Sequence, residues 1–447
     1  QIDPDVGAAR RTSPTNIGLY LMSAVSARKL GLISAQEAHR RMEETTQTLE
    51  RMEKWRGHLY NWYATDTLVP LHPKYVSSVD SGNLAAALLL CAADAETDDA
   101  SLAGRMRALA EKMDFAALYD SEKNLFVIGF DAEHERFSQS HYDLLASEAR
   151  ILSTAALMLS KVPLKHWSKL SRPCADVEGR SALISWSGTM FEYLMPEIWT
   201  RAPRETLIGQ TVSAAVDAQR RLGERLRRPW GVSESGYYAF DLSLNYQYRA
   251  FGLRALALGG TANEEVVAPY AAALALAVAP TEACKNLRQM EKLGWRGEYG
   301  FYEAADYQHA WGDGTPRIVR SYMAHHQGMA LCAVCNALTD DALAETFARM
   351  PEARAVRLLT DEKPTPRVRL RARPVSPNQE RRRPENRDER MARPEKRIVD
   401  AHLLGGAGAT VLLTADGAAH YVRNGVMATR FDGDLLNRRD AARTLLL

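Results

Sequence analysis

The sequence predicts an all-α-dominated fold, an (α/α) toroid, with one inserted β-hairpin and, after a linker, the start of a β domain. Apolar residues recur at three- and four-residue steps through most of the first 360 residues, which is the period of an amphipathic helix. The segments between these helices are rich in Trp, Tyr, Gly and acidic residues, and a rigid helical ring would position such loops. After residue 398 the pattern changes to the alternation of β-strands.

Length and composition indicate a globular protein with more than one unit. The chain has 447 residues, too many for one ordinary core, and 25% of them are charged. We divide it into a helical domain (1–360), a Pro/Arg-rich linker (361–397) and a truncated β-rich segment (398–447). No apolar run approaches the roughly 20 residues that span a bilayer. The first residues lack an initiator Met and the order of a signal peptide, so we expect a piece of a longer protein.

The helix predictions rest on capping residues and on periodicity. Ser13 starts the first helix and Ser34 caps the second. Within the first helix, Ile17, Leu21 and Val25 recur at four-residue steps. The predicted helices span residues 13–32, 36–55, 84–94, 102–115, 142–161, 190–193, 204–226, 245–258, 264–278, 281–293, 322–338 and 341–350.

Two regions have β character. Residues 125–130 are β-prone, and Phe137 follows them after a polar turn, so we predict a hairpin over residues 120–137, inserted between helices. After residue 398, Asp416-Gly417 and Asn424-Gly425 lie between β-prone runs, and such pairs are strong hairpin signals. We therefore expect the opening strands of a β domain there.

The basic charge of the chain is concentrated in the linker. Residues 363–397 hold 13 Lys and Arg against 5 Asp and Glu, a net charge of +8. Because the whole chain carries +2, the other residues together carry about −6. The same segment holds six prolines, which is typical of a domain boundary. A nucleic-acid-binding patch is the alternative, but no aromatic residue interleaves with the arginines to stack on bases. We expect a linker and no nucleic-acid partner.

One stretch, residues 229–238, combines a carboxylate with aromatic rings. It reads Pro-Trp-Gly-Val-Ser-Glu-Ser-Gly-Tyr-Tyr, so Glu234 lies near Trp230 and Tyr237, between two glycines that favour turns. Aromatic faces stack on sugar rings and carboxylates act on the glycosidic bond, so this composition is typical of a saccharide site. A surface loop with one solvated Glu is the alternative.

A second carboxylate, Glu148, falls on the apolar stripe of the helix predicted over residues 142–161. It is four residues after Leu144 and three before Ile151, and side chains at these spacings share a helix face. A buried carboxylate must be paired or functional, and burial raises its pKa, which suits a general acid near neutral pH. The alternative is a structural ion pair, for instance with Arg150.

Further acidic and histidine residues stand among aromatic ones. Glu192 lies at the start of a helix, where the alternative is a first-turn Glu favoured by the helix dipole, and Glu303 lies in a stretch that suggests a sugar wall. His325 and His326 are adjacent and do not share a helix face, so they predict no metal site. Because nucleotide, dinucleotide and zinc motifs are also missing, we expect neither metal nor cofactor.

Eight longer motifs occur in order between residues 13 and 357. They are Ser-Pro-Thr-Asn-Ile-Gly-Leu-Tyr-Leu from residue 13, Arg-Gly-His-Leu-Tyr-Asn-Trp-Tyr from 56, Tyr-Val-Ser-Ser-Val-Asp-Ser-Gly-Asn-Leu from 75, Ile-Ser-Trp-Ser-Gly-Thr-Met-Phe-Glu-Tyr-Leu-Met-Pro from 184, Pro-Trp-Gly-Val-Ser-Glu-Ser from 229, Asn-Tyr-Gln-Tyr-Arg-Ala-Phe-Gly from 245, Tyr-Gly-Phe-Tyr-Glu-Ala from 299 and Arg-Ser-Tyr-Met-Ala-His-His-Gln-Gly-Met from 320. Together they resemble the glucoamylase-like middle region of cyclic β-1,2-glucan synthases.

The resemblance implies an (α/α)6 barrel and a retaining transglycosylase that cuts linear β-1,2-glucan and closes it into a ring. The family's acid/base motif matches Glu148, and its nucleophile motif matches Glu234. The parent proteins are large and lie at the bacterial inner membrane, with a glycosyltransferase region before this part and a phosphorylase-like region after it. The expected partners are therefore linear β-1,2-glucan and these other domains, and the expected place is the cytoplasmic face, where this piece would be soluble.

We expect nine residues to hold sugars: Trp62, Asp80, Trp186, Glu192, Trp230, Tyr237, Tyr246, Glu303 and His325. Two alternatives to cyclisation stay open. One is an endo-β-1,2-glucanase on the same barrel, and the other is a non-catalytic glucan-binding module. If a substrate hydroxyl passes the proton, the two carboxylates would stand further apart than the roughly 5–5.5 Å of ordinary retaining enzymes.

Overall fold

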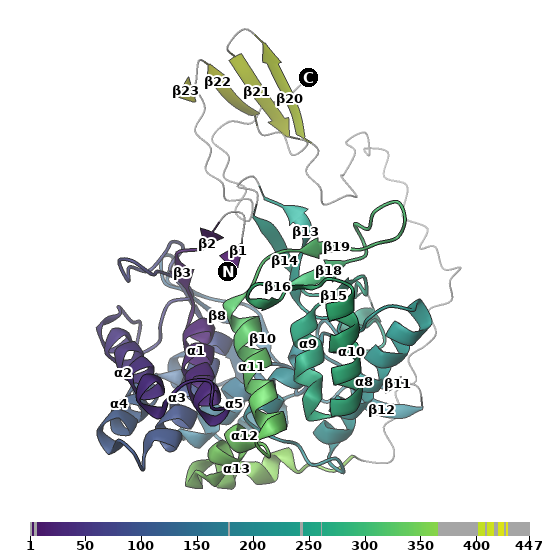
Figure 1. Cartoon of the computed structure of the whole chain (residues 1–447). Coiled ribbons are helices and arrows are strands. Elements are labelled where there is room, and N and C mark those ends of the chain that lie inside the picture. The colour runs from purple at the N-terminus through teal and green to yellow at the C-terminus, as the bar shows by residue number, and fades with distance from the viewer. Residues whose placement is uncertain are drawn as a thin grey trace. The chain divides into compact units, whose positions relative to one another are not determined.

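The computed structural model describes residues 2–3, 7–177, 179–241, 245–260, 262–364, 401–406, 409–414, 419–423 and 426–427. The chain divides into two compact units, a larger one of residues 1–238 and 248–372 and a smaller one of residues 239–247 and 373–447. The larger unit is helix-rich with several small sheets (Figure 1). Because residues 365–400 lie outside the described residues, the domain borders at 360 and 397 stay predictions.

The described α-helices all lie in the larger unit. They are α1 Pro14–Lys29, α2 Ala35–Arg51, α3 Ser78–Ala95, α4 Ala100–Glu111, α5 Arg150–Met158, α6 Lys165–Lys169, α7 Met190–Leu194, α8 Leu207–Leu226, α9 Pro269–Leu274, α10 Pro280–Lys292, α11 Ala324–Leu338, α12 Ala342–Arg349 and α13 Pro351–Thr360. Ser13 and Ser34 accept hydrogen bonds from backbone N–H groups at the starts of α1 and α2, so both predicted caps are confirmed.

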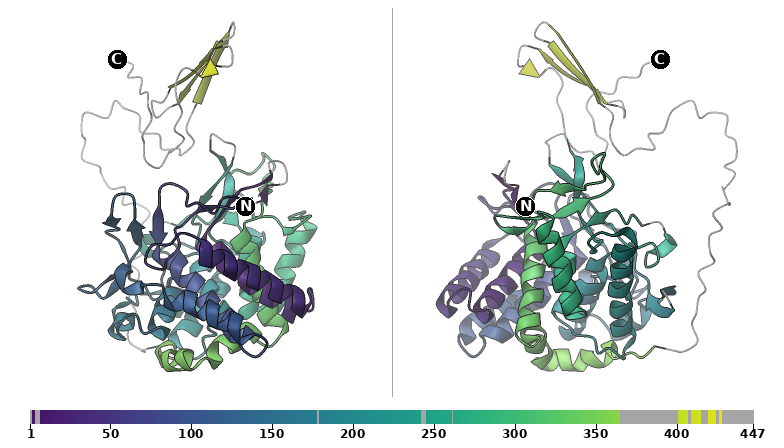
Figure 2. Two further views of the ribbon diagram at one scale, coloured as in Figure 1. Left: turned by 90° about the vertical axis from the view of Figure 1, so that its left-hand side faces the viewer. Right: turned by 45° about the vertical axis from the view of Figure 1, so that its right-hand side comes forward.

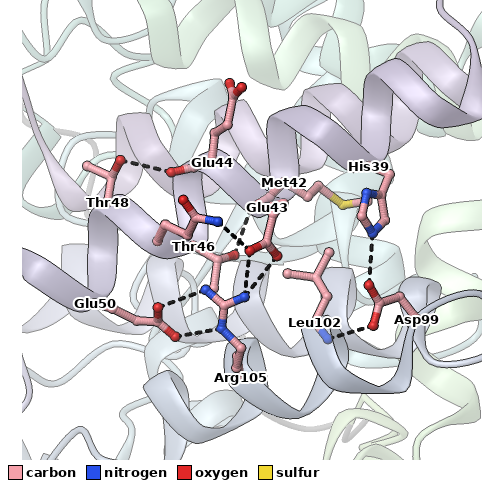
Figure 3. Close-up of polar contacts among 11 residues, drawn as sticks. His39, Met42, Glu43, Glu44, Thr46, Thr48, Glu50, Asp99, Leu102 and Arg105 are labelled. Carbon is pink, nitrogen blue, oxygen red and sulfur yellow. Dashed lines mark hydrogen bonds and ion pairs between the residues drawn. The ribbon is translucent and has the colours of Figure 1, made fainter.

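Polar contacts join α2 to α4 on the outside of the unit (Figure 3). Arg105 of α4 binds Glu43 at 2.6 Å and Glu50 at 2.8 Å, both on α2. Asp99 caps α4 and also contacts His39 of α2 at 2.9 Å. These contacts fix the register of the two helices, while their apolar faces pack inward.

The core is built around α3, a helix of small and apolar residues. It packs against α1, α4 and α5, and α1 in turn lies beside α11 from the other end of the helical region (Figures 1 and 2). A Cβ atom on Gly82 of α3 would lie 2.4 Å from the Cα of Leu152 on α5, so glycine is required for this approach. Small residues thus allow the central helices to lie close together.

The strands are short and mostly antiparallel. In the larger unit they are β1 Ile2–Asp3, β2 Gly7–Ala8, β3 Arg11–Thr12, β4 Tyr63–Ala64, β5 Tyr75–Ser77, β6 Tyr119–Asp120, β7 Leu125–Val127, β8 Gly129–Asp131, β9 Arg136–Phe137, β10 His141–Tyr142, β11 Cys174–Val177, β12 Arg180–Leu183, β15 Val266–Val267, β16 Arg296–Gly297, β17 Gly300–Phe301, β18 Ala304–Asp306 and β19 Arg317–Val319. In addition, β13 Ser235–Phe240 and β14 Tyr246–Arg249 form a two-stranded sheet. The predicted β region over residues 120–137 is confirmed, but it holds two hairpins, β6–β7 and β8–β9, rather than one.

Two helix predictions, those over residues 142–161 and 264–278, are wrong in part, and the one over residues 245–258 is wrong throughout. Tyr142 lies in β10 and Leu144 bridges to Ser171, so α5 begins only at residue 150 and Glu148 is not on a helix stripe. Residues 246–249 form β14, because their alternating aromatic pattern pairs with β13. The helix predicted from residue 264 starts at Pro269, since Pro favours the first helical position and β15 precedes it. The short helix α6 and the terminal helix α13 were not predicted.

The described part of the smaller unit includes a four-stranded antiparallel sheet, in the order β20–β21–β22–β23. Its strands are β20 Ala401–Gly406, β21 Ala409–Thr414, β22 Ala419–Arg423 and β23 Val426–Met427. The predicted strands on either side of the Asp-Gly and Asn-Gly pairs are confirmed, while the two turns themselves lie outside the described residues. None of the described helices has the length and apolar character needed to cross a membrane.

Candidate active site

Glu234 is held by a loop that distant side chains clamp. Asn286 of α10 binds both the N–H and the C=O of Trp230, at 3.1 and 2.7 Å. In the same way, Gln219 of α8 binds both the N–H and the C=O of Val232, at 2.9 and 2.8 Å. These side-chain amides satisfy backbone groups that a neighbouring strand would otherwise bind. Tyr270 donates to the C=O of Glu234 itself at 2.8 Å. The clamps fix the backbone from which the carboxylate projects.

Glu148 lies in the turn directly before α5. The hydroxyl of Ser147 donates to its Oε2 at 3.0 Å and accepts from the N–H of Ala149 at 3.1 Å, a local contact that competes with helix formation. The ion pair with Arg150 that the sequence left open does not form, because Arg150 binds Glu197 at 2.9 Å. Among the described residues, no cation forms an ion pair with Glu148.

The two carboxylates line one pocket of about 340 Å³, within the size range of small-ligand sites. Three predicted sugar-holding residues line it with them: Trp62, Asp80 and His325. The remaining lining residues were not predicted as site residues. They are Arg11, Ser13, Thr15, Asn16, Asn61, Val79, Asn83, Phe191, Tyr248, Met323 and Ala324.

A polar network supports one wall of the pocket. Thr15 donates to Asp80 at 2.5 Å. With the amide of Asn61 oriented to satisfy both neighbours, its nitrogen donates to Asp80 at 3.2 Å and its oxygen accepts from the indole N–H of Trp62 at 3.2 Å. The guanidinium of Arg11 lies 4.9 Å from the centre of the Trp62 ring. An aromatic face and a carboxylate are thereby held side by side, which suits a sugar ring and its hydroxyls.

Electrostatics separate the two candidate catalytic carboxylates. Burial raises the pKa of Glu148 to about 8, with further increases from the charges of Glu192 and Glu234. Burial raises the pKa of Glu234 to about 7, while hydrogen bonding with the Tyr248 hydroxyl lowers it. The charge of Glu234 raises the pKa of Glu148, so ionisation of one group keeps the other protonated to higher pH. The site can offer one ionised and one protonated carboxyl group near neutral pH.

A buried cluster adjoins Glu234. Glu303 contacts the Nδ1 of His326 at 2.9 Å and accepts from the N–H of Gly236 at 3.0 Å. The His326 ring stacks on Tyr270 with 3.7 Å between centroids, and its Nε2 lies 3.2 Å from the Tyr248 hydroxyl. Glu303 is only 2% exposed and does not line the pocket, so it lies behind Glu234 rather than on a sugar-facing wall.

Sequence reasoning missed Tyr248, Tyr270 and His326. The signal for Tyr248 was present, because on a strand Tyr246 and Tyr248 lie on one face, but the helix assignment hid it. Nothing local marks Tyr270, which lies within an apolar helix, α9, and acts through its hydroxyl.

Glu192 is buried at the N-terminus of α7 and forms a capping box with Thr189. Its carboxylate also accepts from the Ser185 hydroxyl at 2.8 Å and from the N–H of Ser187 at 3.1 Å. This arrangement matches the first-turn role that the sequence left open. Glu192 does not line the pocket, so it acts on Glu148 and Glu234 through its charge.

The other predicted sugar-holding residues lie elsewhere. Trp186 is 47% exposed, and Trp230 lines a separate cavity between α8 and α10. Tyr237 is half-buried and packs edge-on against Phe251. Tyr246 belongs to the smaller unit, with its ring 4.8 Å from that of Phe240. Sugar-holding roles for these residues stay predictions.

Comparisons with known proteins agree with the resemblance noted in the sequence. The Glycoamylase family ("Putative glucoamylase") matches residues 140–351, and a family described as "Protein of unknown function (DUF3131)" matches residues 3–93. The cyclic beta-(1,2)-glucan synthase NdvB of Rhizobium meliloti (strain 1021) is 31% identical over 588 aligned positions, which cover 98% of this chain. The chain spans 20% of the length of that relative.

Solved structures of two endo-β-1,2-glucanases share the fold. The enzyme of Chitinophaga pinensis, in complex with sophorotriose and glucose, is 17% identical with a TM-score of 0.65, over 80% of this chain and 89% of that one. The enzyme of Talaromyces funiculosus, in complex with sophorose, is 13% identical with a TM-score of 0.64, over 81% of this chain and 82% of that one. At these identities the likeness concerns the fold alone.

Proposed function

We propose that this chain is a retaining transglycosylase that closes linear β-1,2-glucan into rings. Its residues 140–351 match the glucoamylase family model, and it is 31% identical to a cyclic β-1,2-glucan synthase. The relative and the structural neighbours support β-1,2-glucan as the substrate class. The observation that carries the proposal is the shared pocket of Glu148 and Glu234, in which burial and neighbouring charges give the two carboxyl groups different pKa values.

One ionised and one protonated carboxyl group in a single pocket suit the roles that the resemblance implies. Glu234 attacks the anomeric carbon as a carboxylate, and Glu148 donates its proton to the leaving glycosidic oxygen. A glycosyl ester on Glu234 results. Glu148, now ionised, takes the proton from a hydroxyl at the far end of the same glucan chain, which attacks the ester and frees Glu234. The new glycosidic bond closes the ring.

The lining of the pocket suits sugar and disfavours water. The oxygens Oδ1 of Asn16 and Asn83 are buried and have no partner among the described residues, so sugar hydroxyls would satisfy them. Trp62, Phe191 and Tyr248 supply apolar surface near the two carboxylates. Cyclisation exceeds hydrolysis only if such surface keeps water from the ester.

We propose that the helices complete an (α/α)6 barrel. Alternate helices of the larger unit pack in series, α1 on α3, α3 on α5, α7 on α9 and α9 on α11. The contact of α11 with α1 then joins the two ends of the series. Glu148 precedes α5 of this series, and Glu234 lies in the segment between α8 and α9, so loops of the ring would hold both carboxylates.

The test is the product formed from linear β-1,2-glucan, measured by mass spectrometry. A cyclase yields rings, each lighter by one water than the linear chain of the same length. Glu148→Gln and Glu234→Gln should each abolish ring formation, whereas Glu44→Gln on the outer surface of α2 should not. If both site variants keep full activity, the proposed catalytic pair is wrong.

Hydrolysis is the second candidate, because the two solved structures compared above are endo-β-1,2-glucanases. Linear oligosaccharides without rings would support it and reject the cyclase. Binding of glucan without any product would leave a non-catalytic binding module.

The chain spans 20% of its curated relative, so we also propose that it works within a larger protein. In that proposal it lies at the cytoplasmic face of the bacterial inner membrane, between a glycosyltransferase region and a phosphorylase-like region. Membrane fractionation of the full-length protein tests the location.

A further inference from the structure

A chain of polar contacts leads from Glu303 to Tyr248, which lines the same pocket as Glu234. Glu303 contacts the Nδ1 of His326 at 2.9 Å, and the Nε2 of His326 lies 3.2 Å from the Tyr248 hydroxyl. Tyr248 lines the same pocket as Glu234, and its hydroxyl lowers the pKa of that carboxyl group. The stack of Tyr270 on His326, with ring planes 9° apart, fixes the orientation of the imidazole. Tyr248 is 39% exposed as a residue, but its hydroxyl faces these buried groups.

The tyrosine hydroxyl has a single proton, so it donates to one acceptor at a time. When the Nε2 of His326 carries a proton, it donates to the Tyr248 oxygen, and Tyr248 is left to donate to Glu234. When Nε2 carries none, it competes with Glu234 for the Tyr248 proton. The protonation state of His326 therefore decides which neighbour receives the hydrogen bond of Tyr248.

Glu303 controls this state through Nδ1. If the Glu303–His326 pair holds one extra proton, that proton lies on Glu303, because burial lowers the pKa of His326 to about 3. The neutral carboxylic acid then donates to Nδ1, so the proton of the neutral imidazole lies on Nε2. Burial raises the pKa of Glu303 to about 7, so the extra proton is available near neutral pH.

We propose that Glu303 and His326 are positioning residues that direct the Tyr248 hydroxyl onto Glu234. Tyr248 then holds Glu234 ionised for attack, and it stabilises the carboxylate again when the glycosyl ester opens. The inference rests on the proposed function, because it assigns Glu234 as the nucleophile. It replaces the sugar-holding role predicted for Glu303 with a role behind the pocket.

Other titratable groups also face this centre. The charges of Glu192, Asp80 and Glu303 raise the pKa of Glu234, and Glu148 shares its pocket. The Nε2 of His325 lies 3.4 Å from the Tyr248 hydroxyl, but burial holds the pKa of His325 well below its usual value, so it stays neutral. A pH effect must therefore be assigned by single-residue variants.

The first test is Tyr248→Phe, which removes only the hydroxyl. We expect this variant to lower kcat by about 10- to 100-fold and to change KM little, because it loses a hydrogen bond that stabilises the charge of Glu234. The acidic limb of the kcat/KM profile should move up by about one to two pH units, since Glu234 loses the donor that favours its ionised form. Tyr119→Phe is the matched control, because the Tyr119 hydroxyl is buried without a partner among the described residues. Wild-type kcat and pH profile in Tyr248→Phe would overturn the proposal.

The second test compares Glu303→Gln with Glu303→Ala. The amide of Gln can accept from Gly236 and donate to Nδ1 of His326, which fixes the proton on Nε2. We expect Glu303→Gln to keep kcat and KM near wild type at neutral pH, and Glu303→Ala to lose kcat. A raised KM with unchanged kcat in Glu303→Gln would restore the direct sugar-holding role instead.

The third test does not depend on turnover. The pKa of Glu234 is followed by ¹³C NMR of labelled Glu carboxyl groups, with its signal assigned by Glu234→Gln. It should rise by about one to two units in Tyr248→Phe. An unchanged pKa of Glu234 in Tyr248→Phe rejects the inference, even if the wild-type protein forms rings. If the pKa of Glu234 rises but the wild-type protein forms no rings, the contact with Tyr248 is supported and the cyclase is rejected.

Discussion

The buried ion pair between Arg150 and Glu197 offers a quantitative test of how α5 and the turn before it are held. The two side chains are 4% and 5% exposed, and the Nη2–Oε1 distance is 2.9 Å. Arg150→Met removes the cation and leaves Glu197 with the N–H of Ala202 at 3.0 Å. Removing one partner of a buried pair costs about 3–5 kcal/mol, so we expect the free energy of unfolding at pH 8 to fall by about that amount.

The loss should depend on pH in a defined direction. Burial raises the pKa of Glu197 and the charge of Arg150 lowers it, so Arg150→Met raises the folded-state pKa further above the unfolded value of about 4.3. A carboxyl group with a raised folded-state pKa binds an extra proton on folding. The contribution of Glu197 to stability is therefore fully present below the pKa of the unfolded state. It is lost as the pH rises through the pKa of the folded state. The deficit of the variant is therefore smaller at pH 5 than at pH 8.

Urea unfolding at both pH values, followed by circular dichroism, measures the effect. The double variant Arg150→Met with Glu197→Leu should recover most of the lost stability, because an apolar pair of similar volume leaves no uncompensated charge. Arg40→Met is the matched control, since Arg40 is 53% exposed and its ion pairs are screened by solvent. A double variant as unstable as the single one, or a deficit independent of pH, would refute the reasoning.

Three further predictions concern the site and the core. The kcat/KM for ring formation should rise through a pH of about 7 as Glu234 ionises and fall above about 8 as Glu148 loses its proton, and a profile flat from pH 5 to 7 would contradict this assignment. Gly82→Ala should lower the free energy of unfolding by about 1–3 kcal/mol, because its Cβ would lie 2.4 Å from the backbone of α5. Gly104 of α4 has open space where a Cβ would lie, so Gly104→Ala should raise the free energy of unfolding by about 0.5–1 kcal/mol. Chemical denaturation measures both changes. Trp62→Ala should raise KM for linear β-1,2-glucan by about 2- to 10-fold with a smaller effect on kcat, and an unchanged KM would remove Trp62 from the sugar wall.

Glu148 and Glu234 were predicted as a catalytic pair from chemistry and resemblance, but part of the reasoning for Glu148 was wrong. Glu148 was placed on a buried helix stripe, whereas it lies in a turn before α5 that the Ser147 hydroxyl stabilises. Its burial follows from the pocket that it shares with Glu234. Glu303 was expected on a sugar wall because aromatic residues flank it, yet His326 and a backbone N–H bind its carboxylate behind the pocket.

Local pattern determined the helical majority of the chain, the caps at Ser13 and Ser34, and the strands beside the Asp-Gly and Asn-Gly pairs. These features depend on backbone torsions and on hydrogen bonds between residues a few positions apart, so a short stretch of sequence is enough to predict them. The tertiary structure decided which groups meet. Arg150 binds Glu197 rather than Glu148, and Tyr248 lines one pocket with Glu234, because packing brings together segments that no local pattern relates. Burial and neighbouring charges set the pKa values of both glutamates, and those surroundings exist only once the helices have packed.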